Sequence, residues 1–229
     1  MACMVSAPKP GERADIEDGA ALLARCSESM ARIARLSGAS ATQFAATYRP
    51  LLVKWATYLQ RLPDVDAPGA TLLERRLRWA EQVLARRQGV ILPIGTEPER
   101  AAREADLWTF AVFSVALLRR LGTALAPLAV ALWSAQHQAV GRWRPDLHPR
   151  GLASVENAAA YSVFPNAASP CTEWVLLAAG ALLDNVARDW LWREPSVLAV
   201  WKQALVAPAL PPPIQALFSV EPASGARSL

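Results

Sequence analysis

A long apolar segment near the middle of the chain, Asp106–Gly122, constrains the fold more than any other stretch. Its apolar side chains cover most of the circumference of a helix: Leu107, Trp108, Phe110, Val112, Phe113, Val115, Leu117 and Leu118. A helix that is apolar on all sides has to be buried, so this segment is predicted to be the centre of a helical core. Gly122 is expected to end the helix as a left-handed cap, and Arg119 and Arg120 mark its exit from the core.

The composition favours helix over strand along the whole chain. Hydrophobic residues make up 53% of the 229 residues, glycines number only 11, and alanine and leucine are abundant. We therefore predict an all-α fold, with a single multi-helix domain at residues 15–206. Disordered tails are expected at 1–14 and at 207–229, and the second tail is rich in proline.

Apolar residues at helical spacing delimit seven predicted helices. These lie between Asp15 and Leu36, Ser40 and Pro63, Asp66 and Gly89, Thr96 and Gly122, Ala124 and Val140, Ser169 and Leu191, and Glu194 and Val206. Ser40 with Gln43 and Thr96 with Glu99 have the spacing of capping boxes, and Asp66 is a candidate N-cap.

Three other segments interrupt this helical pattern. Pro50 is expected to kink or break the helix that contains it. Residues 159–164 are either a short strand or an extended crossing, and 141–151 form a loop that is rich in proline and arginine.

The apolar stretch Leu107–Trp133 is long enough to cross a membrane, but its charges argue against a span. Arg119 and Arg120 fall near its middle, where each would cost about 2.5–3.5 kcal/mol on insertion scales, and Pro127 interrupts it. The three cysteines lack metal-ligand spacing and do not define a disulfide framework. No apolar signal-peptide region follows the N-terminal basic residues. A cytoplasmic protein without a membrane span is therefore expected.

The basic character of the chain comes almost entirely from arginine. The formal net charge is +4, the isoelectric point is about 9.3, and only Lys9, Lys54 and Lys202 are lysines. Arginine suits bidentate contacts with phosphate and carboxylate groups. A net charge this small does not by itself indicate a nucleic-acid partner.

Three segments carry a resemblance to a known family. The first is Leu62-Pro63 followed by 68–73 and Arg75, the second is residues 116–123, and the third is Trp190-Leu191 with Glu194-Pro195. In this order they resemble the HD-type domain at the front of TraI-like relaxases of the MobH class, which belong to conjugative plasmids and integrating conjugative elements. The resemblance covers roughly residues 45–206 and implies an HD-like fold and a role in DNA mobilisation.

The same resemblance implies a metal site whose ligands this chain lacks. Histidines and an aspartate of the family's first two segments hold a divalent metal for phosphodiester chemistry, whereas the matching positions here are Arg75, Arg119 and Arg120. The paired histidines expected between Pro63 and Gly69 are also absent. A guanidinium has no lone pair to donate and stays protonated, so no metal, no cofactor and no catalytic residue is predicted.

The remaining candidate residues do not suggest another catalytic site. His137 and His148 are interpreted as structural or solvated, and Asp64 and Asp66 as turn or capping residues. Ser114 and Cys171 lack a His or Asp partner nearby in the sequence, so no nucleophilic constellation is predicted.

Two uses remain open for Arg75, Arg119 and Arg120. They pair with acidic residues at helix ends (Glu74, Glu104, Asp106 or Asp184), or they line a cationic cleft that binds phosphate. Trp143, flanked by Arg142 and Arg144, is a candidate contact for a partner protein or a base, provided that it is exposed.

The predicted function is a catalytically inactive HD-like domain that acts as an interaction or scaffold module in conjugative DNA transfer. The alternative is a module that binds DNA or nucleotide phosphate through the arginine cleft. An active metal-dependent relaxase or phosphohydrolase with relocated ligands is the third hypothesis. The expected partners are DNA or another conjugation protein, and the oligomeric state is left open.

Overall fold

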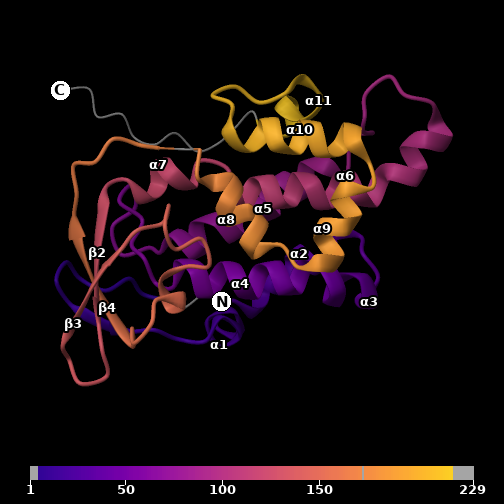
Figure 1. Ribbon diagram of the computed structural model, residues 1–229. Coiled ribbons are helices and arrows are strands. Elements are labelled where there is room, and N and C mark those ends of the chain that lie inside the picture. The colour runs from indigo at the N-terminus through magenta and orange to yellow at the C-terminus, as the bar shows by residue number, and fades with distance from the viewer. Residues whose placement is uncertain (1–4, 172, 219–229) are drawn as a thin grey trace.

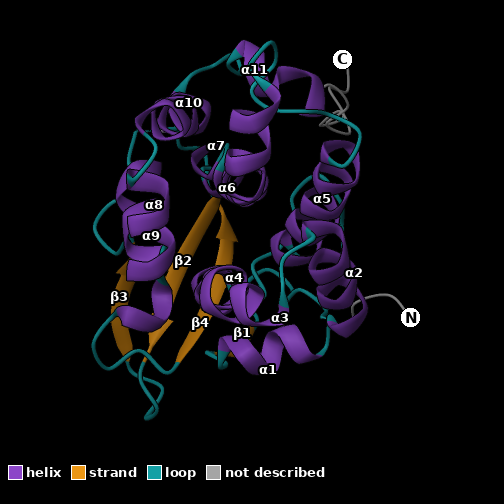
Figure 2. Cartoon of the chain, turned by 90° about the vertical axis from the view of Figure 1, so that its right-hand side faces the viewer, coloured by secondary structure: helices purple, strands orange, loops and turns teal. Residues whose placement is uncertain are grey.

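The computed structural model describes residues 5–171 and 173–218, and in this part of the chain helices lie on one side of an antiparallel sheet (Figures 1 and 2). The four strands are β1 (Arg13–Asp15), β2 (Leu128–Trp133), β3 (Ala139–Trp143) and β4 (Ala160–Pro165), in the order β1-β4-β2-β3. The prediction of an all-α fold is therefore wrong, because the chain is mixed α/β.

The helical layer contains most of the described chain. Its α-helices are α1 (Gly19–Ala24), α2 (Ser27–Ser37), α3 (Ala41–Gln43), α4 (Arg49–Leu59), α5 (Leu72–Arg87), α6 (Pro98–Leu118), α7 (Leu121–Leu125), α8 (Val175–Leu182), α9 (Asn185–Trp192), α10 (Pro195–Val206) and α11 (Pro212–Gln215). A π-helical segment spans Phe44–Tyr48, and 3-10 turns span Leu152–Ser154 and Ala216–Phe218.

The central position of α6 is confirmed. Every residue from Leu107 to Leu118 is buried, and α6 packs between α5 and α10. The helix ends at Leu118, and the left-handed residue that follows is Arg120, with φ 57°, rather than Gly122. By length and composition the stretch Pro98–Leu125 could cross a bilayer, but 78% of its most apolar window is buried inside the fold.

The helix predicted between Ala124 and Val140 is wrong. After the short α7, this segment forms the β2–β3 hairpin, and His137 takes a left-handed conformation in its turn (φ 64°). Pro127 cannot donate a helical hydrogen bond, and β2 alternates buried Val130 and Leu132 with partly exposed neighbours. The pairing of β2 with β4, far away in sequence, decides between helix and strand here.

The two predicted tails are partly ordered. In the N-terminal region Val5 is buried and β1 pairs with β4, which settles 160–165 as a strand. In the C-terminal region Leu217 and Phe218 are buried, and Arg86 donates a hydrogen bond of 3.0 Å to the Leu217 carbonyl. The rest of both tails, 1–4 and 219–229, lies outside the described residues.

The observed N-termini of the helices agree with the predicted caps only in part. Ser40 caps α3 by accepting from the Gln43 amide, as predicted, and a π-helical segment separates α3 from α4 ahead of Pro50. α5 begins at Leu72 with a capping box from Thr71 and Glu74, so Asp66 is not its N-cap. At α6 the N-cap is Glu97, which makes no side-chain cap, so the predicted box there is wrong.

The described cysteines differ from each other. Cys171 is free and exposed, whereas Cys26 is disulfide-bonded. The spacing of the three cysteines did not indicate this bond.

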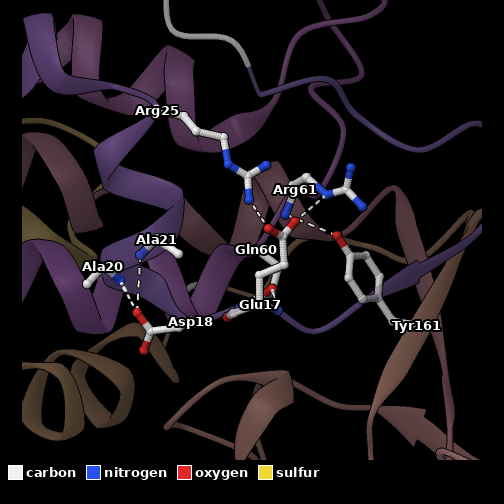
Figure 3. A network of polar contacts seen from close by, with 8 residues as sticks. All are labelled: Glu17, Asp18, Ala20, Ala21, Arg25, Gln60, Arg61 and Tyr161. Carbon is white, nitrogen blue, oxygen red and sulfur yellow. Dashed lines mark hydrogen bonds and ion pairs between the residues drawn. The ribbon is translucent and has the colours of Figure 1, made fainter.

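A polar network joins the β1–α1 connection to the end of α4 and to the sheet (Figure 3). The buried Gln60 side chain accepts from the Glu17 amide at 2.7 Å and donates to the Glu17 carbonyl at 2.8 Å. The Glu17 carboxylate lies between Arg25 and Arg61. The Arg61 amide donates to the Tyr161 hydroxyl of β4 at 3.0 Å. Three segments distant in sequence are thereby held together.

The Tyr161 hydroxyl is expected to contribute to stability because it satisfies the Arg61 amide. Tyr161→Phe should lower the free energy of unfolding by about 1–2 kcal/mol, since a partly buried N–H loses its acceptor. Chemical denaturation measures this.

Tyr58 provides a matched control. Its hydroxyl is buried without a hydrogen-bond partner among the described residues, so Tyr58→Phe should leave stability within about 0.5 kcal/mol of the parent or raise it. Equal destabilisation by the two variants would contradict the assigned role of the Tyr161 bond.

Candidate functional site

A small pocket of about 150 Å³ lies between the 62–72 turn, the start of α5 and the α6–α7 junction. The turn is closed by the bridge between Pro63 and Thr71 and by the Asp64 amide, which donates to the Ala70 carbonyl at 3.0 Å. The residues that line the pocket are Asp64, Val65, Asp66, Leu72, Arg75, Arg76, Arg120, Thr123 and Ala124. This pocket brings together the first two segments of the family resemblance.

Arg75 forms ion pairs inside this pocket. Its Nη1 donates to Asp64 Oδ1 at 2.8 Å and to Asp66 Oδ2 at 2.6 Å. Burial alone lowers the pKa of the Arg75 guanidinium, but the hydrogen bonds to Asp66 and Asp64 outweigh it, so that its pKa is raised. Arg75 therefore stays charged and pairs with one oxygen of each carboxylate.

Asp64 is the most buried acidic group of the pocket, with 1% of its side chain exposed. Its Oδ1 also accepts from the Asp66 amide at 3.1 Å, whereas Oδ2 has no hydrogen-bond partner in the described chain. The sequence interpretation of Asp64 as a turn residue is consistent with these bonds, but it missed the ion pair. The spacing between Asp64 and Arg75 is visible in the sequence, yet only the 62–72 turn brings them together.

Arg119 does not point into this pocket. It is buried, and its guanidinium donates to the carbonyls of Ala204, Ala207 (3.0 Å) and Pro208 (2.9 Å) at the C-terminal end of α10. The last carbonyls of a helix lack partners within the helix, and the negative end of the helix dipole favours a cation. Arg119 thus caps α10 from the end of α6.

Arg120, unlike the buried Arg119, lies at the protein surface. Its side chain is exposed and lines the pocket with Arg75 and Arg76. Its left-handed backbone is unfavourable for a residue with a Cβ. The structure therefore brings two of the three predicted arginines together and adds Arg76, which sequence reasoning missed.

The second predicted group, Arg142, Trp143 and Arg144, lines another pocket of about 400 Å³. Trp143 lies in β3 rather than in a loop, is only 6% exposed, and packs edge-on against Tyr58 with ring centroids 5.4 Å apart. The premise that Trp143 is exposed is therefore wrong. Arg142 and Arg144 are exposed, and Arg144 pairs with Asp146 at 2.6 Å, which raises the pKa of the guanidinium through that hydrogen bond.

The histidines do not converge on either pocket. His137 lies in the β2–β3 turn, and His148 Nδ1 accepts from the Arg144 amide at 3.2 Å. Among residues 5–171 and 173–218, no three side chains of His, Cys, Asp or Glu are grouped so as to hold a metal ion.

The fold and the pocket define a helical domain with a one-sided antiparallel sheet and an arginine–carboxylate cluster at the helix junction. The profile of the TraI_2 family, described as "Putative helicase", matches residues 13–207. The chain belongs to this family and is a TraI-like, relaxase-related region of conjugation proteins. No curated protein matches the chain.

Removal of Arg75 should destabilise the fold, because the buried Asp64 carboxylate loses its counter-charge. Arg75→Ala is expected to lower the free energy of unfolding by about 3 kcal/mol, because it leaves a buried charge without its partner. Denaturant titration at neutral pH measures the change, and the added Asp64→Asn substitution should recover part of it.

The control is Arg78→Ala on the same helix, since Arg78 is exposed. This variant should stay within about 0.5 kcal/mol of the parent. A loss at Arg75→Ala no larger than at Arg78→Ala would contradict the ion pair.

Proposed function

We propose that this domain is a non-catalytic interaction module of the conjugative DNA-transfer machinery. The observation that carries the proposal is the Arg75 guanidinium, which pairs with Asp64 and Asp66 in the pocket where the HD pattern requires metal ligands.

Charge and coordination chemistry support this proposal. A divalent cation needs lone-pair donors, and carboxylates are among its preferred ligands. Both carboxylates of the pocket already pair with Arg75, and the pocket is further lined by Arg76 and Arg120. A cation entering it would meet fixed positive charge and would have to displace an ion pair.

Arg119 supports the same conclusion in a different way. Its hydrogen bonds to the end of α10 make it part of the fold. A side chain held in this way supports the fold and is not directed at a substrate, which agrees with a domain that acts through binding DNA or another conjugation protein.

A second candidate function is phosphate binding in the same pocket. Arg120 favours it, because its side chain is exposed and its backbone is held in the left-handed region. Non-glycine residues in this strained conformation cluster at functional sites. Arginine forks bind phosphate oxygens through paired hydrogen bonds. Asp64 and Asp66 offset part of the positive charge, so this function ranks second.

Metal analysis of the purified full chain tests the first proposal. After incubation with Mn²⁺, Fe²⁺ or Zn²⁺ and desalting, the protein should retain far less than one equivalent of any metal, because both pocket carboxylates are paired with Arg75. Retention of about one equivalent, lost on Asp64→Ala, together with phosphodiesterase activity, would contradict the proposal.

A nucleotide-binding experiment separates the second candidate. If the pocket binds phosphate, Arg120→Ala should weaken the binding of a labelled nucleoside triphosphate by about tenfold, and binding should fall as salt rises. Arg78→Ala is the control of equal charge. Unchanged affinity in Arg120→Ala would exclude the pocket as a phosphate site.

A further inference from the structure

The sheet has a face that the helices do not cover. In Figures 1 and 2 the helices lie together on one side of β2, β3 and β4. The large buried strand residues point to that side, among them Val130, Leu132, Tyr161, Val163 and Trp143. Because strand side chains alternate, the residues between them face outward.

The pairing register orders these outward residues. Arg13 is opposite Ser162, Ser162 is opposite Ala131, and Ala131 is opposite Arg142, so the four form one row across all four strands. Trp133 lies two residues from Ala131 in one direction along the strands. Phe164 lies two residues from Ser162 in the other direction.

We call this surface the outer sheet face and define it by Arg13, Trp133, Arg142 and Phe164. The aromatic rings come from the two central strands, and the arginines come from the two edge strands. The positions between them hold the small side chains Ala129, Ala131 and Ser162.

The two rings differ in their surroundings: Phe164 is exposed, whereas Trp133 is partly buried and has the Arg13 guanidinium against its ring. Trp133 Nε1 donates to Ser162 Oγ at 3.2 Å, which holds the indole over the sheet, and the Arg13 guanidinium lies 4.5 Å from the ring centroid. Phe164 is 43% exposed. Along the strands the rows of Trp133 and Phe164 are roughly 13 Å apart.

We infer that the outer sheet face binds single-stranded nucleic acid. Unpaired bases stack on exposed aromatic rings, whereas the bases of a duplex are already stacked on each other. Arginines on both edges can reach the phosphates on either side of the stacked bases. The small side chains of Ala129 and Ala131 let bases approach the sheet, whereas Ser162 is buried and bonded to the indole of Trp133. The Arg13–Trp133 stack is a cation–π contact that a base can extend.

Charge complementarity favours this occupant over a protein surface. The row of small residues is flanked by Arg13 and Arg142, whose two positive charges exceed the one negative charge of Asp15 in the Trp133 row. DNA and RNA share the chemistry that this surface recognises. The inference is independent of the proposed loss of metal binding, because none of its four residues lines the Asp64–Arg75 pocket.

Fluorescence anisotropy of the full chain with a labelled oligothymidine of about ten nucleotides tests the inference. Phe164→Leu and Trp133→Leu should each weaken binding by about tenfold, and Arg142→Ala by a smaller factor that shrinks at high salt. Trp192→Leu is the matched aromatic control, because Trp192 is 47% exposed on α9, away from the sheet. Thermal melting of each variant shows whether the protein remains folded. Substitutions at Phe164 and Arg142 should leave the fold intact, because both side chains are exposed.

A duplex and an RNA strand serve as further probes of the outer sheet face. Preference for the single strand over a duplex of the same length supports the inference, and an oligouridine of equal length shows whether DNA or RNA is preferred. Absence of binding at low salt, equal affinity for the duplex, or equal weakening by Trp192→Leu would overturn it. Loss of binding in Arg120→Ala but not in Phe164→Leu would overturn it in favour of the pocket.

Discussion

The burial of α6, and the way the chain leaves it, governs the rest of the structure. The helix is enclosed from Leu107 to Leu118, so the chain leaves it from inside the protein. Arg119 remains buried and donates to the final carbonyls of α10, while Arg120 reverses the chain in a left-handed conformation. That reversal starts α7 and directs Leu128–Trp133 into the sheet, so one junction links core, pocket and sheet.

The sequence predicted those features that depend on local chemistry. The apolar Leu107–Leu118 face requires burial wherever it lies, and Ser40 can satisfy a helix end within its own turn. The family could also be recognised, because its motifs are short and contiguous.

The sheet could not be predicted in the same way. Residues 128–133 are apolar enough for either helix or strand, and their pairing partner, 160–165, is distant in sequence. The three arginines predicted a pocket without metal ligands, but only the fold reveals that Arg75 contacts Asp64 while Arg119 contacts α10. The sequence predicts a loop at Trp143, since the burial of this residue depends on Tyr58 of α4, which is distant in sequence.

Arg75, Arg119 and Arg120 therefore have three different surroundings. Arg75 neutralises a carboxylate with 1% of its side chain exposed, Arg119 caps a helix, and Arg120 is exposed beside the pocket. An ion pair whose acid is this deeply buried costs several kcal/mol to break. A metal would have to recover that energy with few donors, which is the physical basis for regarding the pocket as closed to cations.

The most direct test of that claim is a crystal structure of the full chain soaked in Mn²⁺, with anomalous scattering to locate the ion. The account predicts Arg75 Nη1 within hydrogen-bonding distance of Asp64 and Asp66, and no anomalous peak in the pocket. A peak roughly 2.0–2.3 Å from the Asp64 carboxylate, with Arg75 displaced, would contradict it.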